Sequence, residues 1–244
     1  MRAIVLTLVL LLAGTAAAVD DYTDDERAAL RAEIRAYLLE NPEVLREAIT
    51  VLEERDAARQ LAEDQANIVA NAEALTHDGY SYVGGNPDGE LTVVEFIDYQ
   101  CGFCKRAHPD ITAIVAADTE LRYVVKELPL LGSVSVVAAR LAMAVLELEG
   151  PEAYATLNDA LLEHDGQLSE PVILDYVAEV ADVDAAIEMA RTPEIRGRLN
   201  ETRALANAIG LTGTPTFIIG DRMVRGALPR AELEAIVAEA KTDP

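Results

Sequence analysis

Two cysteines, Cys101 and Cys104, are the only ones in the 244 residues, and thiols at this spacing are a candidate redox dithiol. A β-branched and aromatic run at residues 91–98 predicts a buried strand before them, and residues 105–117 carry apolar side chains at helical spacing. Cys101 should therefore cap a helix, where unpaired backbone N–H groups and the helix dipole favour an anion. We expect Cys101 to ionise below the free-thiol pKa of about 8.5 and to be the nucleophile. Cys104, one turn into the helix, would resolve the intermediate.

Other uses of a CxxC pair fit this sequence less well. A closed zinc site needs four ligands, and besides carboxylates only three histidines remain. A purely structural disulfide would close so small a loop that it would remove little entropy from the unfolded chain. Soft thiolates also select copper(I), so an envelope copper-binding protein with Cys101 and Cys104 as ligands is the alternative function. No cofactor is predicted.

Residues 1–18 have the pattern of a secretory signal peptide. An apolar run at residues 4–13 follows Arg2, and three alanines at residues 16–18 form a small-residue cleavage site. An uncleaved membrane anchor would need about 20 apolar residues. Cleavage after Ala18 would leave an exported, soluble chain in an oxidising compartment, and we expect that compartment to be a periplasm.

The chain is strongly acidic, with a formal net charge of −23. This charge argues against nucleic acid and anionic membranes as partners. Solubility or adaptation to salt explains the acidity without a partner selected by charge.

Residues 19–76 are predicted to form an N-terminal helical region. Its first helix should carry one apolar face, made of Leu30, Ile34, Tyr37 and Leu38. Asn41 followed by Pro42 marks the start of a second helix, which keeps an apolar face for two turns and is highly charged at residues 53–59. So charged a helix either packs on the main domain or pairs with copies of itself. We expect the second arrangement, an oligomerisation stalk over residues 20–75.

The globular domain is predicted over residues 77–244. A short strand at residues 80–83 should form a hairpin leading into the strand at residues 91–98, and another strand covers residues 121–127. Five helices should follow as a block, at residues 133–148, 151–163, 170–181, 184–191 and 193–209. The chain should then close with a hairpin and a helix, at residues 216–219, 222–225 and 229–241.

This order of elements predicts an α/β fold of the thioredoxin type, with a helical domain inserted at about residues 132–210 and an N-terminal helical segment before it. Two motifs flank the insertion, FIDYQCGFCK at residues 96–105 and GTPTF at residues 213–217. With these motifs the sequence resembles the DsbA-like thiol:disulfide oxidoreductases, from about residue 80 to residue 241. The leader, with YLLENPEVL at residues 37–45, is similar to the N-terminal region of the ScsC-like subgroup, which is associated with suppressing copper sensitivity.

The resemblance implies roles for five residues. Cys101 would form a mixed disulfide with a client protein, and Cys104 would release it. Glu95 matches a partly buried acid that shuttles a proton for Cys104, although an ordinary strand-edge carboxylate is the alternative. Pro215 matches the family's cis-proline, where a trans bond entering a strand is the alternative. Thr214, just before it, would tune substrate release and redox poise.

The sequence departs from the most oxidising members of the family between the cysteines. Those members carry a histidine there, whereas this chain has Gly102 and Phe103, so a less extreme oxidant is expected. Among the neighbouring polar residues, Asp98 should be a turn or cap residue, Lys105 a solvated helix lysine, and His108 a surface or packing histidine rather than a catalytic base.

Together these features predict an enzyme, an exported thiol:disulfide oxidoreductase that forms or isomerises disulfide bonds in client proteins. Its partners would be cysteine-containing clients, a membrane redox partner that reoxidises or reduces the dithiol, and other copies of the chain. A stalk that joins protomers would favour isomerisation over oxidation. Copper(I) binding that is lost on Cys101→Ser would instead support the copper-binding alternative.

Overall fold

A computed structural model describes residues 22–242, so the predicted signal peptide lies outside the described residues. The chain divides into two compact units, Met1–Ala57 and Ala58–Pro244. Within residues 22–242, no helix is both long and apolar enough to cross a bilayer.

The first unit contains helix α1, Asp24–Glu40, and the first part of helix α2, Glu43–Ala70. A capping box starts α1: the Thr23 hydroxyl accepts the Glu26 N–H, and the Glu26 carboxylate accepts the Thr23 N–H at 2.8 Å. No residue of α1 is buried. Large apolar side chains are exposed along this unit, at Tyr22, Leu30, Ile34, Tyr37, Leu39, Leu45, Ile49, Val51 and Leu52.

The second unit is built on a five-stranded sheet with the order β1-β3-β2-β4-β5. Its strands are β1 (Tyr82–Gly85), β2 (Leu91–Ile97), β3 (Leu121–Glu127), β4 (Thr216–Ile219) and β5 (Arg222–Arg225). β2 and β3 are parallel and are joined by helix α4, Gly102–Ala117, whereas every other pair of neighbours is antiparallel. The β4–β5 hairpin was predicted, and it is confirmed.

The predicted hairpin between residues 80–83 and β2 is wrong, because β1 pairs with β3. β2 already has β3 on one side and β4 on the other, so it has no free edge for β1. The connecting loop instead crosses the start of β3, where the Asn86 N–H donates to the Leu121 carbonyl at 2.8 Å. A Cβ on Gly89 would meet the Glu120 carbonyl oxygen at 2.6 Å, so only glycine allows this close crossing.

Both faces of the sheet are covered, and alternate residues of β2 point to the two faces. Val93 and Ile97 pack with α4 and with helix α10, Arg230–Thr242. Val94 and Phe96 pack on the other face with Ile68 of α2, Leu75 of helix α3 (Ala72–Thr76) and the end of helix α9. Glu95 therefore points towards α4, the helix that carries the cysteines. A strand buried on both faces explains the almost continuous apolar run in the sequence.

The end of α2 is held on the sheet by polar contacts as well. The Arg225 guanidinium donates two hydrogen bonds to the Asp64 carboxylate, at 2.7 and 2.8 Å. Gln65 Nε2 donates to Asp221 Oδ2 at 2.8 Å. From Asp64 on, α2 thus packs on the main domain, whereas residues 58–63 are exposed.

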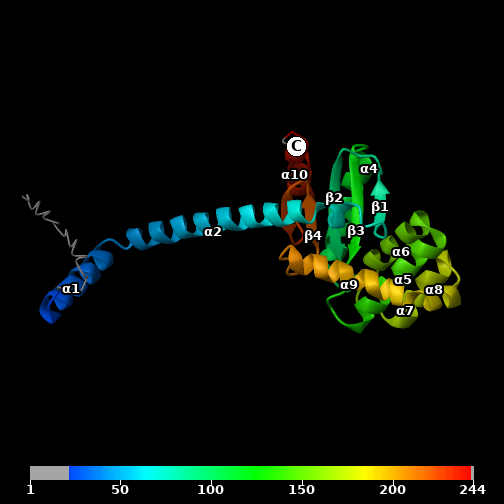
Figure 1. Cartoon of the computed structure of the whole chain (residues 1–244), viewed down its shortest axis with the longest axis horizontal. Coiled ribbons are helices and arrows are strands. Elements are labelled where there is room, and N and C mark those ends of the chain that lie inside the picture. Colours follow the sequence, from blue (N-terminus) through cyan, green and yellow to red (C-terminus); the bar gives the residue numbers. More distant parts are fainter. Residues whose placement is uncertain (1–21, 243–244) are drawn as a thin grey trace, which may run out of the picture. The chain divides into compact units, whose positions relative to one another are not determined.

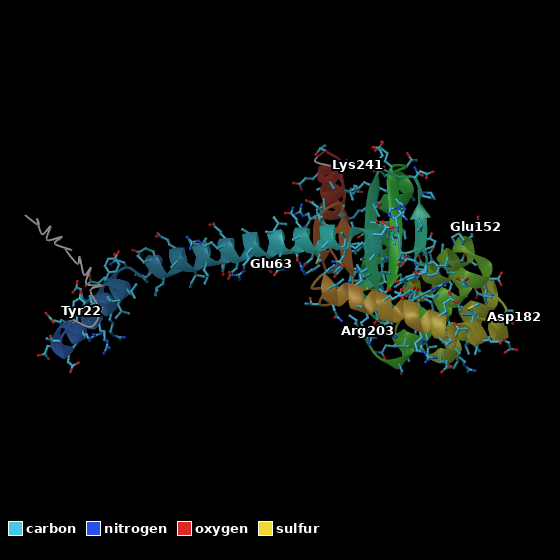
Figure 2. The ribbon with its side chains drawn as sticks, viewed as in Figure 1. Tyr22, Glu63, Glu152, Asp182, Arg203 and Lys241 are labelled. Carbon is cyan, nitrogen blue, oxygen red and sulfur yellow. The ribbon has the colours of Figure 1, made fainter. Side chains whose placement is uncertain are left out.

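The five predicted helices of the block are all present. They are α5 (Ser133–Glu149), α6 (Pro151–Glu163), α7 (Glu170–Val180), α8 (Val183–Ala190) and α9 (Pro193–Ala208). Figure 1 shows α5 to α8 gathered beside the β1 edge of the sheet, while α9 runs back along one end of the strands. In Figure 2, Arg203 on α9 marks the end of the sheet at which β3 leads into Pro129, and the Arg203 guanidinium donates to the Pro129 carbonyl. Lys241 marks the opposite end of the sheet, where its ammonium group pairs with the carboxylates of Asp118 and Glu120.

Candidate active site

The active-site turn joins β2 to α4, and Cys101 is the N-cap of α4, as predicted. Its backbone N–H donates to the Asp98 carbonyl at 2.9 Å, and its own carbonyl accepts the Lys105 N–H at 3.1 Å. Both cysteines are free thiols. Both are buried, although Cys101 keeps some exposed surface and Cys104 keeps none.

The surroundings of Cys101 favour its thiolate. A hydrogen bond from the Cys104 side chain, together with backbone N–H groups of Cys104 and Phe103 and the side chain of Thr214, lowers the pKa of Cys101 to about 5, against the opposing effect of partial burial. The direction agrees with the expectation for a helix N-terminus. At neutral pH Cys101 is therefore mostly a thiolate, the form in which a thiol can act as a nucleophile.

Cys104 behaves in the opposite way. Burial raises the pKa of Cys104 far above that of a free thiol, and donation to Cys101 and the negative charge of Glu95 raise it further. Cys104 is therefore protonated at neutral pH, and it could act as a nucleophile only after a nearby group had taken that proton.

Glu95 lies close to Cys104 and is buried, so the strand-edge alternative is wrong. The Tyr123 hydroxyl donates to Glu95 Oε2. Burial raises the pKa of Glu95 to about 7, while the Tyr123 hydrogen bond and the charge of His108 act in the opposite direction. A carboxyl that titrates near neutral pH is suited to exchange protons in both directions.

The segment before β4 completes the site. The Thr214–Pro215 peptide bond is cis, as predicted, and the Cys101 sulfur lies 3.1 Å from the Thr214 carbonyl oxygen, to which the protonated thiol donates. Thr216, the first residue of β4, donates from its hydroxyl to the Gly213 carbonyl at 2.8 Å. The fold thus brings together all five predicted site residues, although 113 positions separate Cys101 from Thr214.

Lys105 corrects one prediction, because it is not a solvated lysine. Its ammonium group donates to the carbonyls of His164 and Gly166, both at 2.7 Å, and burial lowers its pKa. Gln100 also contacts this loop. Its Nε2 donates to the Leu168 carbonyl and its Oε1 accepts the Leu168 N–H, both at 3.0 Å. Sequence reasoning missed both contacts, because the loop that accepts them lies about 60 residues away and carries no local signal.

Asp98 and His108 occupy the places predicted for them. Asp98 is a turn residue whose carboxylate accepts the N–H groups of Gln100, Leu130 and Leu131 at 2.6 to 2.9 Å. His108 is a packing histidine, buried on α4, with Nε2 at 2.9 Å from Asp159 Oδ1.

A second buried carboxyl, Glu127 at the end of β3, was not anticipated. Its Oε1 accepts the hydroxyls of Tyr99 and Tyr154, both at 2.7 Å. Burial raises the pKa of Glu127 to about 8, although the two tyrosine hydrogen bonds oppose this shift. The only sequence signal was an acidic residue at the end of an apolar strand.

Large apolar side chains are exposed beside the turn. Phe103 lies within the CxxC motif, and Leu130 and Leu131 follow β3 in the segment whose backbone Asp98 holds. The Arg106 guanidinium lies 4.2 Å from the centre of the Phe103 ring. Among the described residues, no three His, Cys, Asp or Glu side chains are grouped as a metal site would require.

A thioredoxin fold with an inserted helical block and a CxxC at a helix start defines a DsbA-like thioredoxin domain. The family model of the DSBA-like thioredoxin domain matches residues 92–238, and the chain belongs to this family. The model of the copper resistance protein ScsC N-terminal domain matches residues 26–59.

Two solved structures illustrate the similarity. A linker-deletion mutant of ScsC from Proteus mirabilis is 27% identical, with a TM-score of 0.69, and the match covers 92% of this chain and 99% of that one. The thiol-disulfide exchange protein α-DsbA2 from Wolbachia pipientis is 31% identical, also with a TM-score of 0.69, and covers 75% of this chain and 97% of its own.

A curated relative is much longer than this chain. The Na(+)/H(+) antiporter NhaA 1 of Salinispora arenicola is 32% identical over 162 residues, which are 65% of this chain and 24% of the antiporter. The chain thus spans about a quarter of the length of the curated relatives it matches.

Proposed function

We propose that this protein is exported to a periplasm and there forms and reshuffles disulfide bonds in client proteins. The observation that carries the proposal is the contrast between the two thiols, a stabilised thiolate at Cys101 and a protonated, buried thiol at Cys104. This contrast separates the attacking sulfur from the resolving one. The signal-peptide pattern of residues 1–18 supports export.

The exchange would proceed in two steps. The Cys101 thiolate attacks one sulfur of a client disulfide, a mixed disulfide forms, and the other client sulfur leaves as a thiolate and takes a proton from water. Cys104 then passes its proton to Glu95 and attacks the sulfur of Cys101. The client leaves with both sulfurs reduced, and the enzyme holds the Cys101–Cys104 disulfide, which a membrane redox partner would reduce. Read in reverse, the same two steps oxidise a client and leave Cys101 and Cys104 as thiols, which the membrane redox partner would have to reoxidise.

Clients would bind across the active-site turn. The exposed side chains of Phe103, Leu130 and Leu131 offer apolar contacts to a partly unfolded chain. Thr214 lies against Cys101, so we assign to it the tuning of client release and redox poise.

We assign residues 19–76 to an N-terminal helical region that joins copies of the chain, and residues 77–244 to the catalytic domain with its insertion at about 132–210. The apolar side chains exposed along α1 and the first part of α2 support this assembly. Joined protomers would present several dithiols to one misfolded client, which favours reshuffling over oxidation.

The experiment is recovery of activity from a scrambled client with wrong disulfide bonds, using reduced protein that begins at Val19. Recovery that Cys101→Ser abolishes would support an isomerase. A matched chain that begins at Ala58 should keep the reactivity of Cys101 but lose most of the recovery, because it lacks the part of the proposed assembly region that carries most of the exposed apolar side chains. If the full chain gives no recovery while its disulfide form oxidises a reduced client, reshuffling is wrong and the protein is an oxidant.

A further inference from the structure

His108 is buried, with 2% of its surface exposed, yet its two ring nitrogens are in different situations. Nε2 lies 2.9 Å from Asp159 Oδ1, whereas Nδ1 is buried with no hydrogen-bond partner. Because buried polar atoms are nearly always paired, an isolated ring nitrogen beside an active site calls for an explanation.

The contact with Asp159 defines which nitrogen carries the proton. A carboxylate only accepts hydrogen bonds, so Nε2 must be the donor. In the neutral ring Nδ1 then has a free lone pair, and it is ready to accept a proton from the interior.

Helix geometry places the His108 ring near the acid of the active site. Cys104 and His108 are four residues apart on α4 and both point into the core, so they lie one turn apart on the same face. Glu95 points to this face from β2, and it interacts electrostatically with both Cys104 and His108. The other titratable group in contact with Glu95 is Tyr123 of β3. Asp159 faces His108 from α6.

The proton of Cys104 also needs a route out of the core. Cys104 and Glu95 are both buried, so a proton that Glu95 accepts is still shielded from water. Asp159 is different, because 54% of its side chain is exposed. His108 contacts this exposed acid and interacts electrostatically with the buried one.

We propose that His108 and Asp159 carry the Cys104 proton between Glu95 and water. The S–H bond of Cys104 breaks as an O–H bond forms on Glu95. Glu95 then gives a proton to His108 Nδ1, and the Nε2 proton passes to Asp159 and on to water. When the Cys101–Cys104 disulfide is reduced again, a proton returns along the same path and restores the first ring tautomer. His108 and Asp159 are positioning residues, since they act through Glu95.

The inference rests on the proposed thiol–disulfide exchange, and the two ideas are tested by separate phases of one reaction. Reduced full-length protein is mixed rapidly with Ellman's reagent. Attack by Cys101 releases one coloured thiolate, and attack by Cys104 on the mixed disulfide releases a second. The first phase tests the proposed nucleophile, and the second tests the proton path.

His108→Gln should slow the second phase by about tenfold or more, because general acid–base steps contribute at least that much, and should leave the first within about twofold. Asp159→Asn should slow the second phase as well, by less, and this surface change tests the path even if His108→Gln fails to fold. Glu163→Gln, an exposed change on the same helix, is the matched control and should alter neither phase.

A pH profile separates a proton path from a structural effect. The wild-type second phase should rise with pH through about 7, as Glu95 becomes free to accept a proton. In His108→Gln the midpoint should move to higher pH, because a His108 ring that has taken up a proton lowers the Glu95 pKa and a glutamine cannot do so. If the rate of the second phase and its pH midpoint in His108→Gln and in Asp159→Asn equalled those of the wild type, the proton path would be overturned. A wild-type protein without a first phase would overturn the proposed function instead.

Discussion

The two compact units differ in what covers their apolar side chains. From Ala58 on, both faces of the sheet are packed, and almost every large apolar residue of the strands is buried. In the first unit, which ends at Ala57, no residue of α1 is buried. Tyrosine, leucine and isoleucine side chains are exposed along α1 and along the first part of α2. The second unit thus has a hydrophobic core of its own, whereas no residue of α1 in the first unit is buried.

Helix α2 shows the same contrast within one element. Its buried residues, Asp64 and Ile68, both lie beyond the boundary between the units. Leu45, Ile49 and Leu52 lie before it and are exposed, although they are the more apolar set. Hydrophobicity alone therefore does not decide burial, and a packing partner is needed.

The largest effect is expected where the first unit is changed. Ile34→Asp together with Leu30→Asp should abolish the proposed assembly, because two charges would enter an apolar face. The unfolding midpoint and the Cys101 phase with Ellman's reagent should stay the same, since both depend on the second unit. Native mass measures the assembly, and Ala32→Asp, on the opposite side of α1, is the control. A native mass of the wild-type protein equal to one chain would refute the proposed assembly through the first unit.

A smaller effect is expected from a buried acid of the second unit. The pKa of Glu127 is about 8 in the folded protein and about 4.5 in an unfolded chain, so the folded protein keeps a proton that the unfolded chain loses between these values. Stability should therefore fall as pH rises through this window. Glu127→Gln cannot ionise, so from pH 5 to pH 9 it should gain roughly 4 kcal/mol over the wild type.

Urea unfolding at the two pH values measures this difference. Glu152→Gln, at the exposed start of α6, is the control and should follow the wild type at both values (Figure 2). If the free energy of unfolding of Glu127→Gln and of the wild type changed equally between pH 5 and pH 9, the pKa of Glu127 would not be raised in the folded protein.

The smallest effect concerns the docking of α2. Arg225→Ala should lower the free energy of unfolding by about 1–2 kcal/mol, because the buried Asp64 would lose a pair of charged hydrogen bonds. Arg222→Ala, on the same strand, breaks a more exposed pair with Glu239 and should cost no more than about 0.5 kcal/mol. If Arg225→Ala and Arg222→Ala lowered the free energy of unfolding by the same amount, the ion pair between Asp64 and Arg225 would add nothing to the docking of α2.

Most of the fold was predictable because its signals are local. Proline at a helix start, glycine in the turns and the strand-to-helix change at Cys101 each act over a few residues, and the predicted helices of the block begin and end within about two residues of the observed ones. The pairing of β1 was not predictable, because turn residues show where a strand ends and not which edge it joins. Lys105 was misjudged for a similar reason, since its partners come from a distant loop.

The sequence by itself determined the type of chemistry: two thiols of one helical turn, placed where a strand meets a helix, and the residues Glu95, Thr214 and Pro215 around them. Only the tertiary structure decided how these groups behave. Burial raises the pKa values of Cys104 and Glu95, the Thr214 carbonyl comes to 3.1 Å from Cys101, and His108 is left with one unpaired nitrogen. Residue type and spacing are properties of the chain, whereas desolvation and contact depend on segments that only folding brings together.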